Sequence, residues 1–153
     1  VCKIAEMISA ILTYCRKGTP MPTPIFHNFS SAPKHVAPFS HAVECDDWIQ
    51  LTGQMPTDPV SDSKPLPDGV EAQTKRVMDN LIIILRELGL DLENVLSVRV
   101  YITQFERDYE AMNKVYKSYF PPDQLPARTC IGVTALARGA LVEIDMVAKR
   151  FRD

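Results

Sequence analysis

The distribution of proline divides this 153-residue chain into parts with different structural capacities. Nine of the 12 prolines fall between Pro20 and Pro67, none falls in residues 68–120, and the last three lie in residues 121–126. Proline lacks a backbone donor, so it interrupts helices and interior strands alike. We therefore expect most of the regular structure to follow residue 68.

Length, charge and hydropathy exclude several classes of protein. The length is that of one domain. The 17 Lys and Arg residues against 19 Asp and Glu residues offer no strongly basic surface for nucleic acid. A bilayer-spanning helix needs about 20 apolar residues, whereas the longest clean apolar run, residues 81–85, stops at Arg86. We predict a single domain that neither binds nucleic acid nor enters a membrane.

The cysteines and histidines form no metal-binding or disulfide pattern. The four cysteines, at positions 2, 15, 45 and 130, have no CxxC spacing, which favours reduced thiols in a cytoplasmic protein. His27, His35 and His41 lie in one irregular segment without Cys or acidic neighbours at zinc-site spacing. We interpret them as loop histidines at the surface and predict no metal site.

Residues 1–22 differ from the rest and are predicted to be an appendage to a domain of residues 23–153. Apolar residues recur at helical spacing from Ile4 to Leu12 and stop before Gly18. Glu6 interrupts the apolar core that a signal peptide would need, which disfavours secretion. The pattern leaves open whether this segment is helical or disordered.

The first part of the predicted domain contains strands and then a helix. Residues 25–29 and 41–53 hold short apolar runs separated by turn residues, which predicts edge-like strands. Residues 71–88 carry apolar side chains at helical spacing and end at Gly89, which predicts a helix.

A strand and a second helix are predicted next. Residues 95–102 alternate apolar and polar side chains, with Leu96 among the apolar ones, which predicts a half-buried strand. Residues 103–106 resemble a capping box, and Pro121 and Pro122 would end the helix that it starts. The buried stripe of this helix is predicted to be Tyr109, Met112, Val115, Tyr116 and Tyr119.

Two final strands, residues 127–134 and 140–148, are predicted to form a hairpin with its turn at Arg138 and Gly139. Because each helix follows a strand and leads to another, both helices should pack on one face of a single mixed sheet. The predicted fold class is α+β.

The predicted hairpin places charged side chains together. Matching its apolar faces puts Arg128, Glu143 and Asp145 on the sheet face away from the helices, beside apolar residues such as Cys130. A face of this mixed character is expected to be covered by another copy of the chain.

These side chains permit two interpretations. Arg128 could hold a carboxylate through paired, charge-assisted hydrogen bonds while Glu143 orients water. Alternatively, Arg128 and Glu143 simply form an ion pair with each other across the interface between copies. Cys130 is interpreted as a small buried side chain rather than a nucleophile, because no nearby histidine is evident to activate it.

Longer motifs resemble a known family. Residues 126–133 (PARTCIGV) and 139–148 (GALVEIDMVA) closely resemble the signature of the RidA/YjgF family of enamine/imine deaminases, also labelled endoribonuclease L-PSP. Supporting matches are residues 37–40 (APFS), 51–56 (LTGQMP), 73–80 and 113–120. The resemblance covers about residues 25–151.

The resemblance implies a chorismate-mutase-like α+β domain that forms a homotrimer with a central barrel and sites between subunits. It implies hydrolysis of 2-aminoacrylate or 2-imino acids to 2-keto acids and ammonia, without a metal or organic cofactor. The position matched by Arg128 binds the substrate carboxylate and that matched by Glu143 positions the water. Main-chain groups at Cys130 contact substrate or water, while Gly53 and Asn113 match positions at or near the site.

Two departures from the family pattern bear on the substrate. Well-known members carry tyrosine where this chain has Phe39, and serine where it has Thr52. Phe39 keeps an aromatic wall but lacks a hydroxyl, and the extra methyl group of Thr52 narrows the pocket. His41 could supply a compensating polar group, although a surface position is the interpretation adopted above.

Two further functions are weighed against the deaminase. The first is a non-catalytic sensor that binds 2-keto or other small carboxylic acids on the same fold. The second, ranked last, is a holdase-like chaperone, for which the sequence offers only the covered apolar surface that any trimer would have.

Overall fold

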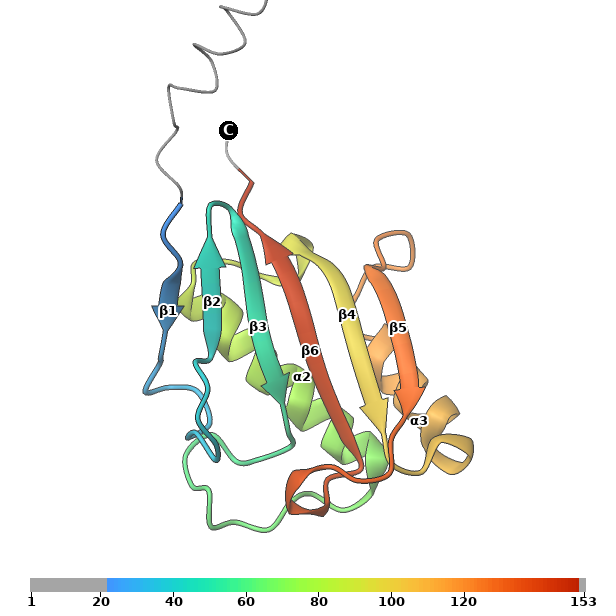
Figure 1. The fold of residues 1–153 in the computed structure, drawn as a ribbon. Coiled ribbons are helices and arrows are strands. Elements are labelled where there is room, and N and C mark those ends of the chain that lie inside the picture. The colour runs from blue at the N-terminus through green and yellow to red at the C-terminus, as the bar shows by residue number, and fades with distance from the viewer. Residues whose placement is uncertain (1–21, 152–153) are drawn as a thin grey trace, which may run out of the picture.

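The computed structural model describes residues 22–151 and forms one sheet with two α-helices on one face. Figure 1 shows α2 and α3 behind the sheet, with the near face of the sheet open. The predicted α+β architecture is therefore confirmed. The elements are β1 (Ile25–His27), β2 (Ala42–Cys45), β3 (Trp48–Gln54), α2 (Gly69–Glu87), η1 (Leu92–Asn94), β4 (Val95–Ile102), α3 (Phe105–Lys117), β5 (Ala127–Gly132), η2 (Ala137–Gly139) and β6 (Val142–Lys149).

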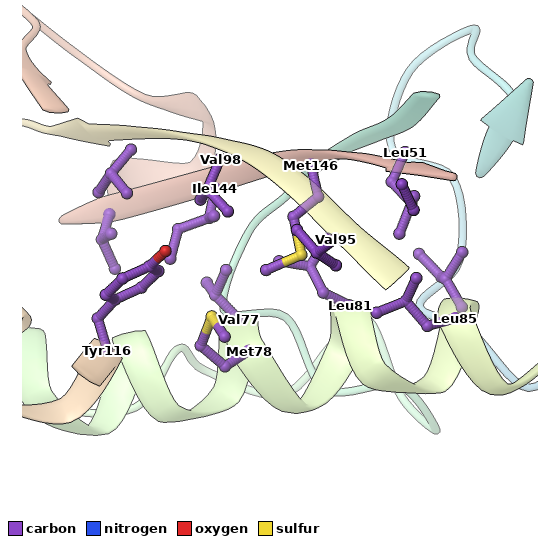
Figure 2. Close-up of a cluster of buried hydrophobic side chains, with 14 of the residues drawn as sticks. Leu51, Val77, Met78, Leu81, Leu85, Val95, Val98, Tyr116, Ile144 and Met146 are labelled. Carbon is purple, nitrogen blue, oxygen red and sulfur yellow. The ribbon is translucent and has the colours of Figure 1, made fainter. Parts of the chain in front are cut away.

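The core lies between α2 and the central strands. Met78, Leu81 and Leu85 on α2 pack against side chains such as Leu51 and Met146 of the sheet, as Figure 2 shows, and all five are fully buried. Burial of each such side chain contributes about 1.5–3 kcal/mol. The predicted helix is confirmed, including its end: Gly89 adopts a φ of 69°, a conformation that favours glycine after a helix.

The strand order is β1-β2-β3-β6-β4-β5, which contradicts the predicted hairpin of residues 127–134 and 140–148. β5 pairs in parallel with β4, while β6 lies between β3 and β4 and is antiparallel to both. The turn residues Arg138 and Gly139 do have positive φ, but they belong to a longer connection that includes η2. β3 is likewise an interior strand rather than an edge-like one.

The altered pairing reverses the predicted orientation of β5. Arg128 stands opposite Val98, which is 1% exposed and faces the helices, so Arg128 and Cys130 also lie on the helix side. Ile131 faces the open side and is 46% exposed. Because β5 is an edge strand, its apolar residues are not constrained to face the core, and matching apolar faces gave the wrong result.

Details around β4 and α3 also differ from the predictions. Leu96 is 36% exposed because the pairing of β4 with β6 shifts register between Val95 and Ser97, which turns Leu96 out of the core. The predicted capping box is wrong: α3 follows Gln104, and no side-chain hydrogen bond from the described residues caps it. Instead the Thr103 amide and hydroxyl both donate to Leu141 O.

The other end of α3 also differs from the prediction. The helix ends at Lys117, before the two prolines, and Ser118 is its C-cap residue. The hydroxyl of Ser118 donates to the backbone oxygen of Val115 over 2.6 Å. Within the predicted stripe, Met112 and Tyr116 are buried. The other members of the stripe, Tyr109, Val115 and Tyr119, are only partly buried.

The predicted appendage of residues 1–22 lies outside the described residues, apart from Pro22. Within residues 22–151, neither helix has the length and apolar character needed to cross a membrane.

Candidate functional site

A pocket at the end of β3 and β6 gathers several of the predicted site residues. Its cavity has a volume of about 210 Å³. We call it the Glu143 pocket, and the residues that matter for its chemistry are Lys34, Phe39, Thr52, Gly53, Met55 and Glu143. Four of the residues predicted for the site, Phe39, Thr52, Gly53 and Glu143, therefore lie together.

Glu143 lies against the backbone of β3. The pairing of β3 with β6 shifts register between Leu51 and Gln54, so Gly53 is located in the irregular part of the ladder. A Cβ atom at Gly53 would overlap Oε1 of Glu143. A side chain at this position would therefore displace the carboxyl group of Glu143 from the place that it occupies beside the strand.

The environment of Glu143 favours its protonated form. Burial raises the pKa of Glu143, and the neighbouring Asp145 raises it further. Asp145 itself is 7% exposed and accepts hydrogen bonds from Nε of Arg99 at 2.9 Å and from the hydroxyl of Tyr101 at 3.1 Å. A carboxyl group with a raised pKa, in a pocket, is suited to exchange protons with bound water.

The loop before β2 forms one wall of the pocket and is fixed by His41. His41 is 1% exposed; Nδ1 accepts from the Phe29 amide at 3.0 Å, and Nε2 donates to Pro33 O at 2.9 Å. Both contacts use the neutral imidazole, and burial lowers the pKa of His41. The prediction of a surface loop histidine is therefore wrong for His41, which instead sets the shape of the loop.

Phe39 and Thr52, the two positions at which the chain departs from the family pattern, lie in this wall and at its base. The Thr52 hydroxyl donates to Ser40 O at 2.6 Å, and the Thr52 amide donates to His41 O at 3.0 Å, so Thr52 ties β3 to the loop. Phe39 is partly buried, with its ring centroid 5.0 Å from that of His35. The aromatic wall expected of Phe39 is present, while the Thr52 hydroxyl already has a backbone partner.

Amide side chains from α2 hold the segments that border the pocket. Nδ2 of Asn80 donates to Met55 O at 3.1 Å and to Thr57 O at 2.9 Å. Oε1 of Gln73 accepts from the Leu141 amide at 2.8 Å, which fixes the chain just before β6. These two residues belong to the 73–80 motif, so the helix of that motif supports the pocket from behind.

The remaining predicted residues lie at a second location, on the helix side of the edge strand β5. Arg128 and Cys130 are neighbours on this side, and Arg128 lies against Tyr116 of α3, the helix that also carries Asn113 three residues earlier in the sequence. We call this group the Arg128 ledge. The Arg128 Cζ atom lies 4.8 Å from the centre of the Tyr116 ring, within the range of a cation–π contact.

The other members of the ledge are buried polar groups. Burial raises the pKa of the Cys130 thiol, so this cysteine is a poor nucleophile at neutral pH. Oδ1 of Asn113 and the hydroxyl of Tyr116 are both buried and have no hydrogen-bond partner within residues 22–151.

A single copy does not bring the pocket and the ledge together. Glu143 stands opposite Tyr101 on the open side of the sheet, whereas Arg128 stands opposite Val98 on the helix side. No ion pair joins Arg128 to Glu143 in the described part of the chain. The prediction that Arg128 and Glu143 share one face of the sheet is therefore wrong, whereas an ion pair between them across an interface stays a prediction.

A larger cavity, about 300 Å³, lies elsewhere, between the end of α2, η1 and the segment after α3. It contains none of the predicted site residues. Over residues 22–151, no group of three or more His, Cys, Asp or Glu side chains is arranged to hold a metal ion.

Sequence reasoning missed two residues that shape the site. His41 gave no sign of burial, because its position in a proline-rich segment suggested a loop at the surface. Tyr116 was predicted to be buried on its helical spacing, but its contact with Arg128 depends on the parallel pairing of β5, which the sequence did not indicate.

Comparisons with known proteins agree with this geometry. The family model described as Endoribonuclease L-PSP matches residues 29–150. A RutC family protein of Pyrococcus abyssi is 37% identical over 76% of this chain and 90% of its own length. The 2-iminobutanoate/2-iminopropanoate deaminase of Mus musculus is 38% identical over 78% of this chain and 86% of its own length. The crystal structure of E. coli TdcF with bound serine has a TM-score of 0.75 at 25% identity and covers 83% of this chain and 99% of that chain.

Proposed function

Because the chain belongs to the Endoribonuclease L-PSP family, also called RidA/YjgF, we propose that it hydrolyses reactive enamines and imines. Its substrates would be 2-aminoacrylate and small 2-imino acids, and its products 2-keto acids and ammonia. The observation that carries the proposal is the position of Glu143, a carboxyl group with a raised pKa at the wall of a pocket. The name of the mouse relative supports the choice of substrate.

The proposed site forms between two copies of the chain. Arg128 and Glu143 project from opposite sides of the sheet, so a substrate that touches both must take them from different copies. Apolar side chains on the open face support association: Phe26 is 66% exposed and Trp48 is 50% exposed. We propose the homotrimer with a central barrel that the family resemblance implies.

The proposed chemistry needs only an anchor, a water molecule and a proton acceptor. Arg128 of one copy binds the substrate carboxylate through charge-assisted hydrogen bonds. Glu143 of another copy, in its ionised form, accepts a proton from water as the water oxygen attacks the imine carbon. Glu143 passes this proton to the substrate nitrogen, and the carbon–nitrogen bond breaks as the added oxygen forms the carbonyl group. The hydroxyl proton returns to Glu143, and ammonia and the 2-keto acid are released.

The size of the Glu143 pocket supports a small substrate. Sites for drug-sized ligands usually enclose about 300–1,000 Å³, and the part of the proposed site that one copy supplies has a volume of about 210 Å³. Phe39 and Thr52 border the space where the substrate side chain would lie. We propose that they determine which 2-imino acid is preferred, and that TdcF, a relative with bound serine, marks the size range of ligands.

The test generates 2-imino acids with an amino acid oxidase and traps them with semicarbazide. Wild-type protein should lower the amount of semicarbazone, because hydrolysis competes with trapping. Arg128→Ala should lower kcat/KM at least about 100-fold, since it removes two charge-assisted hydrogen bonds of about 1.5–3 kcal/mol each. Arg86→Ala, which removes an exposed arginine beside the larger cavity, is the matched control and should behave as wild type.

Two results would contradict parts of the proposal. Full activity of a correctly folded Arg128→Ala variant would exclude Arg128 as the anchor. Failure of the wild type to compete for any 2-imino acid would exclude the deaminase. In that case, an increase of the wild-type melting temperature by 2-oxobutanoate would support the non-catalytic carboxylate sensor instead.

A further inference from the structure

The Arg128 side chain rests on an aromatic ring that is itself rigidly held. Cζ of Arg128 lies 4.8 Å from the centre of the Tyr116 ring. Tyr116 is 3% exposed, and its ring centroid is 5.1 Å from that of Phe120. Figure 2 shows the Tyr116 side chain rising from α3 toward the sheet, beside the apolar residues of the core.

We propose that Tyr116 is a positioning residue whose ring face holds the Arg128 guanidinium in the orientation that receives the ligand carboxylate. This inference rests on the proposed function, because it assigns Arg128 the role of anchor. Tyr116 acts through Arg128 and does not itself touch the ligand.

The contacts of Arg128 support this role. Within residues 22–151 its guanidinium makes no ion pair or hydrogen bond, so the ring of Tyr116 is the group that restrains it. A ring covers one face of the planar guanidinium and leaves its N–H edge available for a carboxylate. A long side chain held in place before binding loses less conformational entropy when the ligand arrives.

The ring, rather than the hydroxyl, carries the proposed role. The hydroxyl of Tyr116 is buried and has no hydrogen-bond partner among the described residues. Burial raises the pKa of Tyr116 to about 12, so the group stays neutral and protonated at physiological pH. The ring attracts the cation through its quadrupole, which does not require the hydroxyl.

Three variants distinguish the contribution of the Tyr116 ring to ligand binding from the contributions of its hydroxyl and of core packing. Tyr116→Leu removes the ring, and Tyr116→Phe retains it. Tyr109→Leu makes the same substitution at a tyrosine of the same helix that packs against the core and stacks on Phe105, and serves as the matched control. If the Tyr116→Leu protein does not fold, Tyr116→Met replaces it, because methionine has a volume similar to that of leucine and a more flexible side chain.

The measurements are the KM and kcat for imine hydrolysis and the Kd for 2-oxobutanoate, a stable 2-keto acid, determined by calorimetry. Tyr116→Leu should raise KM and Kd by about fivefold to thirtyfold, with kcat changed by less than about threefold. Tyr116→Phe should restore values near those of the wild type. Tyr109→Leu should lower the melting temperature without this rise in KM and Kd.

A double variant tests whether Tyr116 acts through Arg128. In an Arg128→Ala background, Tyr116→Leu should not weaken 2-oxobutanoate binding further, because the cation it orients is gone. An equal loss of affinity in both backgrounds would overturn the inference. A folded Tyr116→Leu protein with wild-type Kd, or loss of affinity in Tyr116→Phe, would also overturn it.

The binding measurement separates this inference from the proposed function. If the wild type binds 2-oxobutanoate but hydrolyses no imine, the deaminase fails while the Kd values still decide the role of Tyr116. If the wild type hydrolyses imines and Tyr116→Leu leaves KM and Kd unchanged, the proposed function stands and the positioning role fails.

Discussion

The Glu143 pocket and the Arg128 ledge hold opposite charges in very different surroundings. The pocket is a cavity, walled by a loop that His41 fixes through two hydrogen bonds and lined by a carboxyl group with a raised pKa. The ledge is not a cavity: it is the helix side of an edge strand, where a cation rests on a buried ring. The pocket has the means to move protons, and the ledge has the means to bind an anion.

This difference indicates that one copy carries out the two parts of the proposed reaction, carboxylate binding and proton transfer, on opposite sides of its sheet. On opposite sides of the sheet, Glu143 keeps its raised pKa and Arg128 keeps its donors free of an internal acid. Each copy thus presents both halves of a site, and the proposed site is completed only by association.

Replacing Glu143 should have the largest effect of the changes in the pocket. Glu143→Gln retains the shape of the side chain but cannot accept a proton, so kcat should fall about 10²–10⁴-fold. KM should change little, because the anchor lies on the ledge. The semicarbazide competition assay measures both parameters, and a kcat within about threefold of the wild type would exclude proton transfer by Glu143.

The same variant should be at least as stable as the wild type near neutral pH. Burial beside Asp145 raises the folded-state pKa of Glu143, so the folded chain holds this proton to higher pH than the unfolded chain does. Its ionisation therefore reduces stability as pH rises from the unfolded pKa through the raised folded one. Thermal unfolding at pH 7 and at pH 4 should show the advantage of Glu143→Gln at pH 7 only.

Adding a methyl group at Gly53 should have the next largest effect. A Cβ atom there would overlap the Glu143 carboxyl, so Gly53→Ala should displace it and lower kcat about tenfold to 100-fold. Gly132→Ala is the control near the ledge, where the new Cβ would lie 3.2 Å from Cβ of Phe105. It should cost some stability, seen by thermal unfolding, and leave kcat unchanged; equal losses of kcat in both variants would contradict the account.

Removing the charge of Asp145 should have the smallest effect, a shift of the pH profile. Asp145 raises the pKa of Glu143, although burial is the larger cause. In Asp145→Asn the acidic limb of the kcat/KM profile should therefore move to lower pH but remain above the range of an ordinary glutamate. An unchanged limb, measured in a protein whose Arg99 and Tyr101 contacts persist, would mean that another group controls it.

Local patterns predicted much of this fold, and long-range pairing explains the errors. The helical spacing before Gly89 and the alternation in residues 95–102 were sufficient to find α2 and β4. The turn at Arg138 looked like a hairpin because its residues do have positive φ, yet β4 occupies the place beside β6 that a hairpin would need. Which strand pairs with which depends on the whole sheet, and no local signal carries it.

In the candidate site, too, local patterns predicted some features, while others depend on contacts between distant parts of the chain. The motifs identified Arg128, Glu143 and Gly53, but the physical reason for Gly53 became clear only from its contact with Glu143. The orientation of Arg128 was predicted wrongly because apolar residues on an edge strand need not face the core. Burial of His41 could not be predicted, since its partners are backbone groups of Phe29 and Pro33 in an irregular loop.

The most direct test of the divided site mixes two inactive proteins. Arg128→Ala and Glu143→Gln chains are combined in equal amounts, unfolded and refolded together, and compared with each variant refolded alone. In a symmetric oligomer with one site per interface, about a quarter of all sites in the mixture would contain both an intact Arg128 and an intact Glu143, each from a different copy. The account predicts that the mixture recovers about a quarter of wild-type activity. Mixed oligomers that remain as inactive as either variant alone would contradict it.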